Sequence, residues 1–283
     1  MKFHVSSELE YHLYGPSTLL FALQCRNSNG RDVMLEHLYS EPCVPIESLV
    51  MGDSLNRFSR ISLLDSGTFK LGYSADICVR SRRVPIASMQ RDSPGRFPPP
   101  VLQFLLPSRY CQSDRLRHEA LSLFGHLESP YHIALQIRDW ILANIAYVSG
   151  SSGENCSAME TLQCRQGVCR DFAHLGIAFC RAMSVPARYV SCYAYNLNPP
   201  DFHAYFEAFI DGNWYVFDGT GLAPLNGLIR IAVGRDAADA AVCTLFGTPE
   251  LTSSLVQVRC LETDFHPLTL EMLRDANEGL ALL

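Results

Sequence analysis

The stretch Gln166-Gly167-Val168-Cys169-Arg170-Asp171-Phe172-Ala173-His174-Leu175 places a cysteine two residues after a glycine and at the start of an amphipathic pattern. Apolar residues recur at near-helical intervals as far as Met183, so a helix is expected to begin at or close to Cys169. Unpaired backbone N–H groups and the positive end of the helix dipole meet at a helix N-terminus. They stabilise a thiolate, which is the nucleophilic form of cysteine. The stretch therefore indicates that Cys169 is a nucleophile.

Length and composition restrict the class of protein. A chain of 283 residues predicts one large domain or two modest ones. With 48% hydrophobic and 18% charged residues, it is expected to bury a core rather than remain disordered. The net charge of -6 contains no basic block, which argues against nucleic acid or an anionic membrane as a partner. The N-terminus has no apolar signal core, and no stretch reaches the ~18 apolar residues of a membrane span, so a cytoplasmic location is expected.

The cysteines do not resemble a disulfide scaffold or a zinc site. There are 11 of them, an odd number with irregular spacing and no C-x-x-C pair. Most are expected to be reduced and buried as small apolar residues. Asp236 and Asp239 are interpreted as helix charges, because calcium sites use loops denser in acids. The sequence thus predicts no metal and no cofactor.

Residues 1–97 have the character of an all-β domain. Alternating or apolar runs are bounded by turn residues, with a hairpin signal at 27–30 and a turn at 65–67. The strand spacing suits a small sandwich. Two roles remain open for this domain, namely substrate selection and self-association into a homo-oligomer. The predicted strands are Lys2–Tyr14, Thr18–Cys25, Asp32–Tyr39, Ile46–Met51, Asn56–Leu64 and Thr68–Arg80.

The proline-rich run 93–100 predicts a domain boundary, because three consecutive prolines stop regular strand pairing. Residues 98–283 then mix helical and strand patterns, which indicates an α+β domain. The predicted helices are 114–127, 130–145 with Ser129 as N-cap, a short one opened by a capping box at 157–160, and 169–183. The predicted strands are 185–195, 204–210, 213–217 and 254–261.

A hairpin is expected to bring a base and an acid together. His203 opens one predicted strand and Asp218 closes the next, with Asp211-Gly212 as the turn between them. In antiparallel neighbours, the start of one strand faces the end of the other. A nucleophilic thiol needs such a base and a group that orients it. His174 is a poor alternative base, because five residues of helix turn it ~140° away from Cys169.

Four motifs in order resemble the core of the transglutaminase-like superfamily, and within it the bacterial transglutaminase-like cysteine protease group. They are Gly167–Ala173, Val185–Val190, Phe202–Glu207 and Trp214–Thr220. The resemblance extends over most of the chain, including the N-terminal β domain. It implies a papain-like core, with a nucleophile helix packed on an antiparallel sheet, and carries over Cys169 as nucleophile, His203 as base and Asp218 as orienting acid.

Two positions depart from the group's pattern. Gly219 stands where proline is usual after the acid, and Cys192 stands where glycine is usual before a tyrosine. Neither is a member of the triad. Because of these departures, the resemblance does not determine the shape of the loop beside the predicted site.

Three classes of function remain open. The favoured one is a cysteine peptidase or amidase that acts on a protein or peptide. The second is a cross-linking protein-glutamine transferase, and the third is a non-catalytic scaffold that binds peptides. The Cys169 N–H is one expected oxyanion donor, with Tyr147 or Gln166 as candidates for the other. Hydrolysis is favoured because it requires no amine site.

Overall fold

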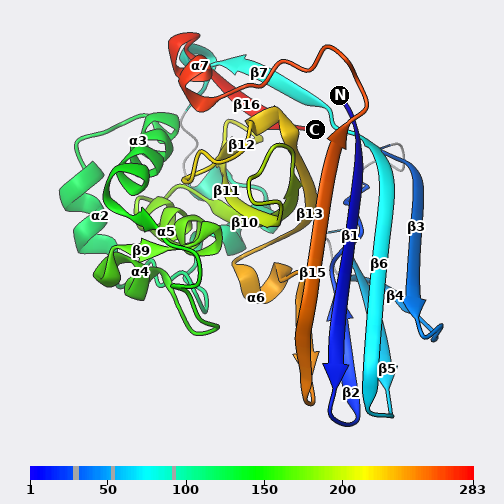
Figure 1. The fold of residues 1–283 in the computed structure, drawn as a ribbon. Helices are drawn as coiled ribbons and strands as arrows, with labels where there is room; N and C mark the ends of the chain where they lie inside the picture. The colour runs from blue at the N-terminus through cyan, green and yellow to red at the C-terminus, as the bar shows by residue number, and fades with distance from the viewer. Residues whose placement is uncertain (28–31, 52–54, 91–93) are drawn as a thin grey trace.

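A computed structural model describes residues 1–27, 32–51, 55–90 and 94–283. Figure 1 shows long strands gathered on one side of the molecule and the helices α2, α3, α4 and α5 on the other. The sheet that carries β10 to β13 lies between these two regions. Residues 28–30 of the hairpin predicted at 27–30 and the first residue of the 93–100 run fall outside the described residues.

Two four-stranded sheets form the β sandwich, in the orders β15-β1-β6-β3 and β14-β2-β5-β4. In β1, every odd-numbered residue from Phe3 to Leu13 is buried, the alternation of a strand with one face on a core. All six strands predicted in this region are present in the structure. Their bounds are β1 Lys2–Leu13, β2 Ser17–Phe21, β3 Val33–Glu41, β4 Glu47–Met51, β5 Asn56–Leu63 and β6 Gly67–Cys78.

The C-terminal part of the chain supplies further strands to this region. Here β14 (Cys243–Phe246) pairs with β2, and β15 (Pro249–Cys260) pairs with β1 over its whole length. Another strand, β16 (Glu278–Leu282), pairs with β7 (Ser81–Pro85). Only the second half of β15 was predicted, at 254–261. A boundary near residue 97 stays a prediction, although strands from both sides of it share the same sheets.

The second region is built on the sheet β12-β11-β10-β13. Three of its strands were predicted, whereas β13 was missed because its apolar run has no distinctive period. The strands are β8 Ala146–Tyr147, β9 Gln166–Gly167, β10 Ala187–Ala194, β11 Phe202–Ile210, β12 Asn213–Phe217 and β13 Leu228–Gly234. The helices are α1 Pro99–Leu102, α2 Arg117–Phe124, α3 Pro130–Asn144, α4 Ala158–Cys164, α5 Cys169–Ala182, α6 Ala237–Ala240 and α7 Leu270–Asp275. Short 3-10 turns lie at Ile86–Ser88, Pro94–Arg96, Gln103–Leu105 and Leu225–Gly227.

Helix α5 is the centre of this region. Every residue from Asp171 to Ala182 is buried, and the helix packs against β11, β10, α3 and α4. At Gly176, a Cβ atom would lie 2.4 Å from a ring carbon of Phe206 on β11. Because Gly176 has no side chain, helix and sheet can approach closely, and this contact fixes the distance between α5 and the sheet. The mixture of sheet and surrounding helices confirms the predicted α+β class.

Candidate active site

The start of α5 is held by its own third residue. Cys169 is the first helical residue, and the Asp171 carboxylate accepts a hydrogen bond from the Val168 N–H at 2.8 Å. Gly167 lies directly beneath this contact, since a Cβ there would approach the Asp171 Cβ to 2.7 Å. The glycine before the cysteine therefore makes room for the residue that caps the helix. Asp171 therefore caps the helix to which it belongs.

The Asp171 carboxylate also ties a loop to the helix start. It is completely buried, and its second oxygen accepts a hydrogen bond from the Ser152 hydroxyl at 2.9 Å. Arg170 donates to the same hydroxyl at 2.8 Å. A buried carboxylate needs such partners, because an unpaired one is costly to desolvate. These hydrogen bonds hold the loop that contains Ser152 against the start of α5.

Tyr147 lies beside Cys169 because β8 and β9 pair in parallel. The pairing places Tyr147 opposite Gly167, two residues before the cysteine. Partial burial raises the pKa of the Tyr147 phenol to about 12, and the Cys169 thiol adds to the rise. The phenol ring packs against Phe172, with 5.8 Å between ring centroids. Of the two candidates for a second oxyanion donor, Tyr147 is the one whose interaction with Cys169 is evident.

The predicted hairpin does bring His203 and Asp218 together. Strands β11 and β12 pair with Phe206 opposite Phe217, and the turn between them has positive φ at both Asp211 (46°) and Gly212 (75°). The His203 Nε2 lies 2.9 Å from an Asp218 carboxylate oxygen. Both side chains are buried, with exposed fractions of 2% and 1%. The turn and the pairing of β11 with β12 therefore bring the two side chains together.

Burial and neighbouring charges shift the pKa values of His203 and Asp218 in opposite directions. Burial lowers the pKa of His203, but the Asp218 carboxylate and hydrogen bonds with Asp218 and Cys169 raise it to about 10. Burial raises the pKa of Asp218, but His203 and Thr220 bring it below its usual value. The His203 Nδ1 has no hydrogen bond of normal geometry within the described part of the chain, and the Cys169 thiol is the group that interacts with this ring. His203 is thus hydrogen-bonded to Asp218 and interacts electrostatically with Cys169.

Two further residues hold Asp218, and sequence reasoning missed both. Thr220 donates to one carboxylate oxygen from its backbone N–H and from its hydroxyl, each at 2.8 Å. Arg138 on α3 donates to the Asp218 carbonyl at 3.1 Å. The Asp-Gly-Thr sequence contains a signal for the first contact, because aspartate often bonds the backbone two residues ahead. The Arg138 contact has no local signal, since 80 residues separate the partners.

The chain is similar to known proteins over most of its length. A family model of the transglutaminase-like superfamily matches residues 120–219, which include Cys169, His203 and Asp218. A family model of the bacterial transglutaminase N-terminal domain matches residues 1–84. A crystal structure from Cytophaga hutchinsonii, described as a "putative cysteine protease", is 42% identical, covers 100% of this chain and 98% of that one, and superposes with a TM-score of 0.96. The chain belongs to the transglutaminase-like superfamily.

Curated relatives of this transglutaminase-like chain are more distant. An uncharacterized protein of Mycobacterium leprae is 35% identical over 36% of this chain and 39% of its own length. An uncharacterized protein of Mycobacterium tuberculosis is 30% identical over 45% of each chain. The match therefore spans less than half the length of these relatives. Within the described ranges, no helix combines the length and hydropathy needed to cross a bilayer.

The two departures from the superfamily's motifs are accommodated differently. At Gly219, a Cβ would meet Ile141 and Phe172 at 3.5 Å, which is ordinary contact, so nothing at this position requires glycine. Cys192 is fully buried and pairs across the sheet with His203. Burial, followed by the nearby charges of Asp218 and Cys169, raises the pKa of the Cys192 thiol well above its usual value. Cys192 is therefore a neutral packing residue beneath the site.

Other candidate groups of the transglutaminase-like core lie away from the site or are otherwise engaged. His174 accepts a hydrogen bond from the Ala237 N–H at 3.1 Å, and burial lowers its pKa well below its ordinary value. Asp236 caps α6, and Asp239 pairs with Arg235. No cluster of three or more potential metal ligands occurs among the residues that the structure describes. Cys164 is a free, exposed thiol on α4.

Proposed function

We propose that the protein is an enzyme that uses Cys169 for acyl transfer from an amide, with His203 as base and Asp218 as orienting acid, and that water completes the reaction. The observation that carries the proposal is the buried His203–Asp218 pair, together with the interaction of the His203 ring with the Cys169 thiol at the start of α5. A solved relative at 42% identity that is described as a "putative cysteine protease" supports a cysteine-dependent enzyme.

The first half of the reaction forms a thioester. Because the pKa of His203 is raised to about 10, its ring holds the proton of the Cys169–His203 pair at neutral pH, and the sulfur attacks the amide carbonyl carbon. The carbonyl oxygen becomes an oxyanion, to which the Cys169 N–H and the Tyr147 hydroxyl donate. The C–N bond then breaks, and the leaving amine takes the proton from His203. Asp218 keeps the ring oriented and stabilises its protonated form throughout.

The second half of the reaction returns the thiol. A water molecule loses a proton to His203 Nδ1 and attacks the thioester carbon. The carbon–sulfur bond breaks, Cys169 regains the proton from His203, and a carboxylic acid leaves. If a primary amine replaces the water, the product is a new amide. Cross-linking is therefore the alternative function, and the acyl acceptor alone distinguishes it from hydrolysis.

The test is a product analysis on Gln-containing peptides with and without a fluorescent primary amine. We expect the wild type to release ammonia or cleave peptides when no amine is present, and Cys169→Ala to do neither. Cys164→Ala is the matched control, because this exposed thiol lies five residues earlier on a neighbouring helix and is expected to be dispensable. If the amine is incorporated in preference to hydrolysis, the protein is a cross-linking transferase and not a peptidase or amidase.

Alkylation separates an enzyme from a peptide-binding scaffold. We expect iodoacetamide to modify Cys169 faster than the more exposed Cys164, because His203 generates the reactive thiolate. His203→Gln is expected to remove this difference. Equal rates at Cys169 and Cys164 in the wild type, together with no turnover of a broad peptide library, would reject the catalytic proposal.

A further inference from the structure

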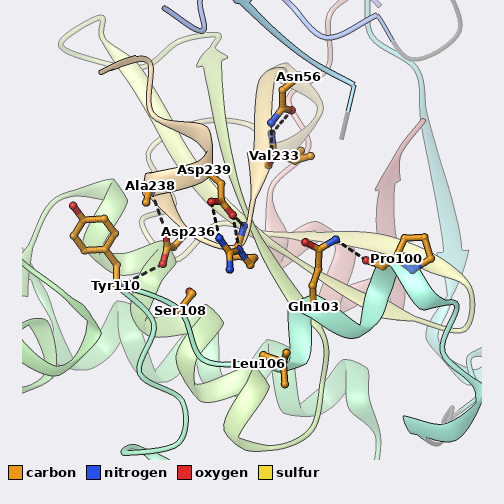
Figure 2. Close-up of polar contacts among 12 residues, drawn as sticks. Asn56, Pro100, Gln103, Leu106, Ser108, Tyr110, Val233, Asp236, Ala238 and Asp239 are labelled. Carbon is orange, nitrogen blue, oxygen red and sulfur yellow. Dashed lines mark hydrogen bonds and ion pairs between the residues drawn. The ribbon is translucent and has the colours of Figure 1, made fainter. Parts of the chain in front are cut away.

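A large hollow lies between the β sandwich and the second sheet, away from the triad. The cavity measures about 580 Å³, and its lining includes none of Cys169, His203 and Asp218. Figure 2 shows wall residues from three separate segments, with Asn56 on β5, Gln103 just after α1, and Val233 and Asp239 at β13 and α6. This volume is within the range of pockets that hold small organic ligands.

On one side of the cavity, a pair of hydrogen bonds joins the β sandwich to the second sheet. The Asn56 amide donates to the Val233 carbonyl at 2.7 Å and accepts from the Val233 N–H at 2.9 Å, as Figure 2 shows. On the opposite side, the Gln103 amide donates to the Pro100 carbonyl and holds the linking segment in a helical turn. The walls are therefore pre-formed, which reduces the entropy that a ligand must overcome.

The charged groups on the cavity wall are predominantly cationic. Arg26, Arg188 and Arg235 contribute to the lining, whereas the acidic residue there is Asp239. Asp239 is already occupied, since both of its oxygens accept from Arg235 at 2.8 and 3.0 Å. The whole chain carries a net charge of -6, so this local excess of positive charge is opposite to the overall balance. A site of this kind attracts anions.

Behind the wall, one carboxylate serves more than one arginine. Glu207 is completely buried, and it accepts hydrogen bonds from the Nε atoms of Arg188 at 2.7 Å and of Arg230 at 2.9 Å. Burial would raise the pKa of Glu207, but these two guanidinium groups lower it to about 2. Its single negative charge is thus hydrogen-bonded to two guanidinium groups, and its attraction for a third arginine, Arg26, is weaker than the repulsion that these two exert on Arg26.

Arg26 is that third arginine. Its Nε and Nη1 are buried, and neither has a hydrogen-bond partner among the residues that the structure describes. Burial, followed by repulsion from Arg188 and Arg230, lowers its pKa to about 10, so it stays charged at neutral pH. A buried guanidinium without a partner is unfavourable unless an anion compensates it.

The remaining wall of the cavity is aromatic and apolar. The Arg188 guanidinium lies 4.1 Å from the centroid of the Trp214 ring, which packs edge-on against Phe104 with 5.2 Å between centroids. Phe58 and Val101 add further apolar surface. Such a wall favours a ligand with an apolar or aromatic body.

We propose that this cavity binds an organic anion, whose carboxylate or phosphate group is held by Arg26 beside the positive charge of Arg188 and whose apolar body lies against Trp214 and Phe104. Guanidinium groups bind both kinds of oxyanion through paired N–H donors, so the chemistry of recognition is shared. The site is separate from the proposed acyl transfer and does not depend on it.

The first test is calorimetric titration with phenyl phosphate, benzoate and benzyl alcohol, which share an aromatic ring and differ in the attached group. We expect at least one of the two anions to bind with a dissociation constant of about 1 mM or tighter, and the neutral alcohol to bind at least tenfold more weakly. The stronger anion identifies the head group. Equal binding of all three probes, or none by either anion at about 10 mM, would overturn the proposal.

The second test uses Arg26→Met, because the unpartnered Nε and Nη1 can be removed without breaking a hydrogen bond. We expect affinity for the anion to fall at least tenfold, while the melting temperature without ligand stays equal or rises. Arg60→Met is the matched control and should leave affinity unchanged, because this exposed arginine pairs with Glu47 on the sandwich. Unchanged affinity in Arg26→Met would assign Arg26 a purely structural role and refute the site. The wild-type titration decides the matter even if this variant does not fold.

Discussion

At His203, burial and a neighbouring charge shift the pKa of the ring in opposite directions. Its ring is 2% exposed, an environment that normally excludes a cation. The Asp218 carboxylate reverses this preference at a distance of 2.9 Å, and Thr220 in turn keeps that carboxylate ionised. The same interactions that orient a base therefore also contribute to the stability of the fold.

The pH dependence of unfolding should report this coupling. Because the pKa of His203 is raised to about 10 in the folded protein, its stabilisation is complete below its unfolded value near ~6.5 and is lost as pH rises toward about 10. The lowered pKa of Asp218 has the opposite sign, so its contribution is present above ~3.9 and is lost as pH falls through the folded-state pKa.

We therefore expect the free energy of unfolding, measured with urea, to decrease between pH ~6.5 and ~10. His203→Gln should flatten this decrease. His118→Gln, at an exposed position on α2, is the control and should leave the profile as in the wild type. Parallel profiles for the wild type and His203→Gln would show that the pair does not stabilise the folded state.

The Tyr147 hydroxyl is expected to act on the oxyanion rather than on the fold. Tyr147→Phe keeps the ring contact with Phe172 and removes only the hydroxyl. Loss of one oxyanion donor lowers kcat by ~10²-fold, so a fall of this order with little change in KM or melting temperature is expected. Tyr14→Phe, which removes an exposed hydroxyl bonded to Glu250, should have no effect on either constant. A change in KM alone would assign Tyr147 to substrate binding instead.

At the scale of elements, the position of α5 depends on close contact with the sheet. Gly167 admits the capping carboxylate at the start of the helix, and Gly176 admits Phe206 halfway along it. The two contacts fix the position of α5 along the sheet and its distance from the sheet. They therefore also fix the position of Cys169 relative to β11. A shift of α5 would move the thiol away from His203.

Gly176→Ala should therefore reduce both stability and activity. The new Cβ would lie 2.4 Å from a ring carbon of Phe206, so either the helix or the ring must move, at a cost of about 1–3 kcal/mol. Gly95→Ala is the control, because nothing lies within 4 Å of a Cβ added there and the φ angle is not positive. Thermal unfolding and kcat measured on both variants check this. Equal stability of the two would mean that α5 tolerates displacement.

At the scale of the whole molecule, the β sandwich is completed by chain that follows the second region. Figure 1 shows β15 beside β1, at the outer edge of the sandwich. The strand is long and largely exposed, and β14 covers the edge of β2 in the same way. Without them, β1 and β2 would present unpaired edges to solvent.

Residues 1–97 alone are thus expected to fold poorly. A fragment of these residues should show no cooperative thermal transition by circular dichroism, whereas a fusion that adds residues 243–260 through a flexible linker should recover one. The full chain is the reference for both. A cooperative transition and a dispersed amide NMR spectrum for 1–97 alone would instead support an independent N-terminal domain with the predicted boundary.

The sequence by itself determined the local parts of this protein. The periodicity after Cys169 predicted α5, and the Asp211-Gly212 turn predicted the hairpin that joins His203 to Asp218, because both depend on residues close in the chain. Motif resemblance then identified the superfamily. Turn chemistry and helical period act over a few residues, so a single sequence contains them.

Only the tertiary structure decided which distant segments meet. The pairing of β15 with β1 and the Arg138 contact to the Asp218 carbonyl join residues far apart in sequence. So does the cavity that unites Arg26 with Arg188. Such contacts depend on which exposed edges and buried charges find partners when the whole chain packs. No local pattern encodes that choice, because its energy arises only from groups that folding itself brings together.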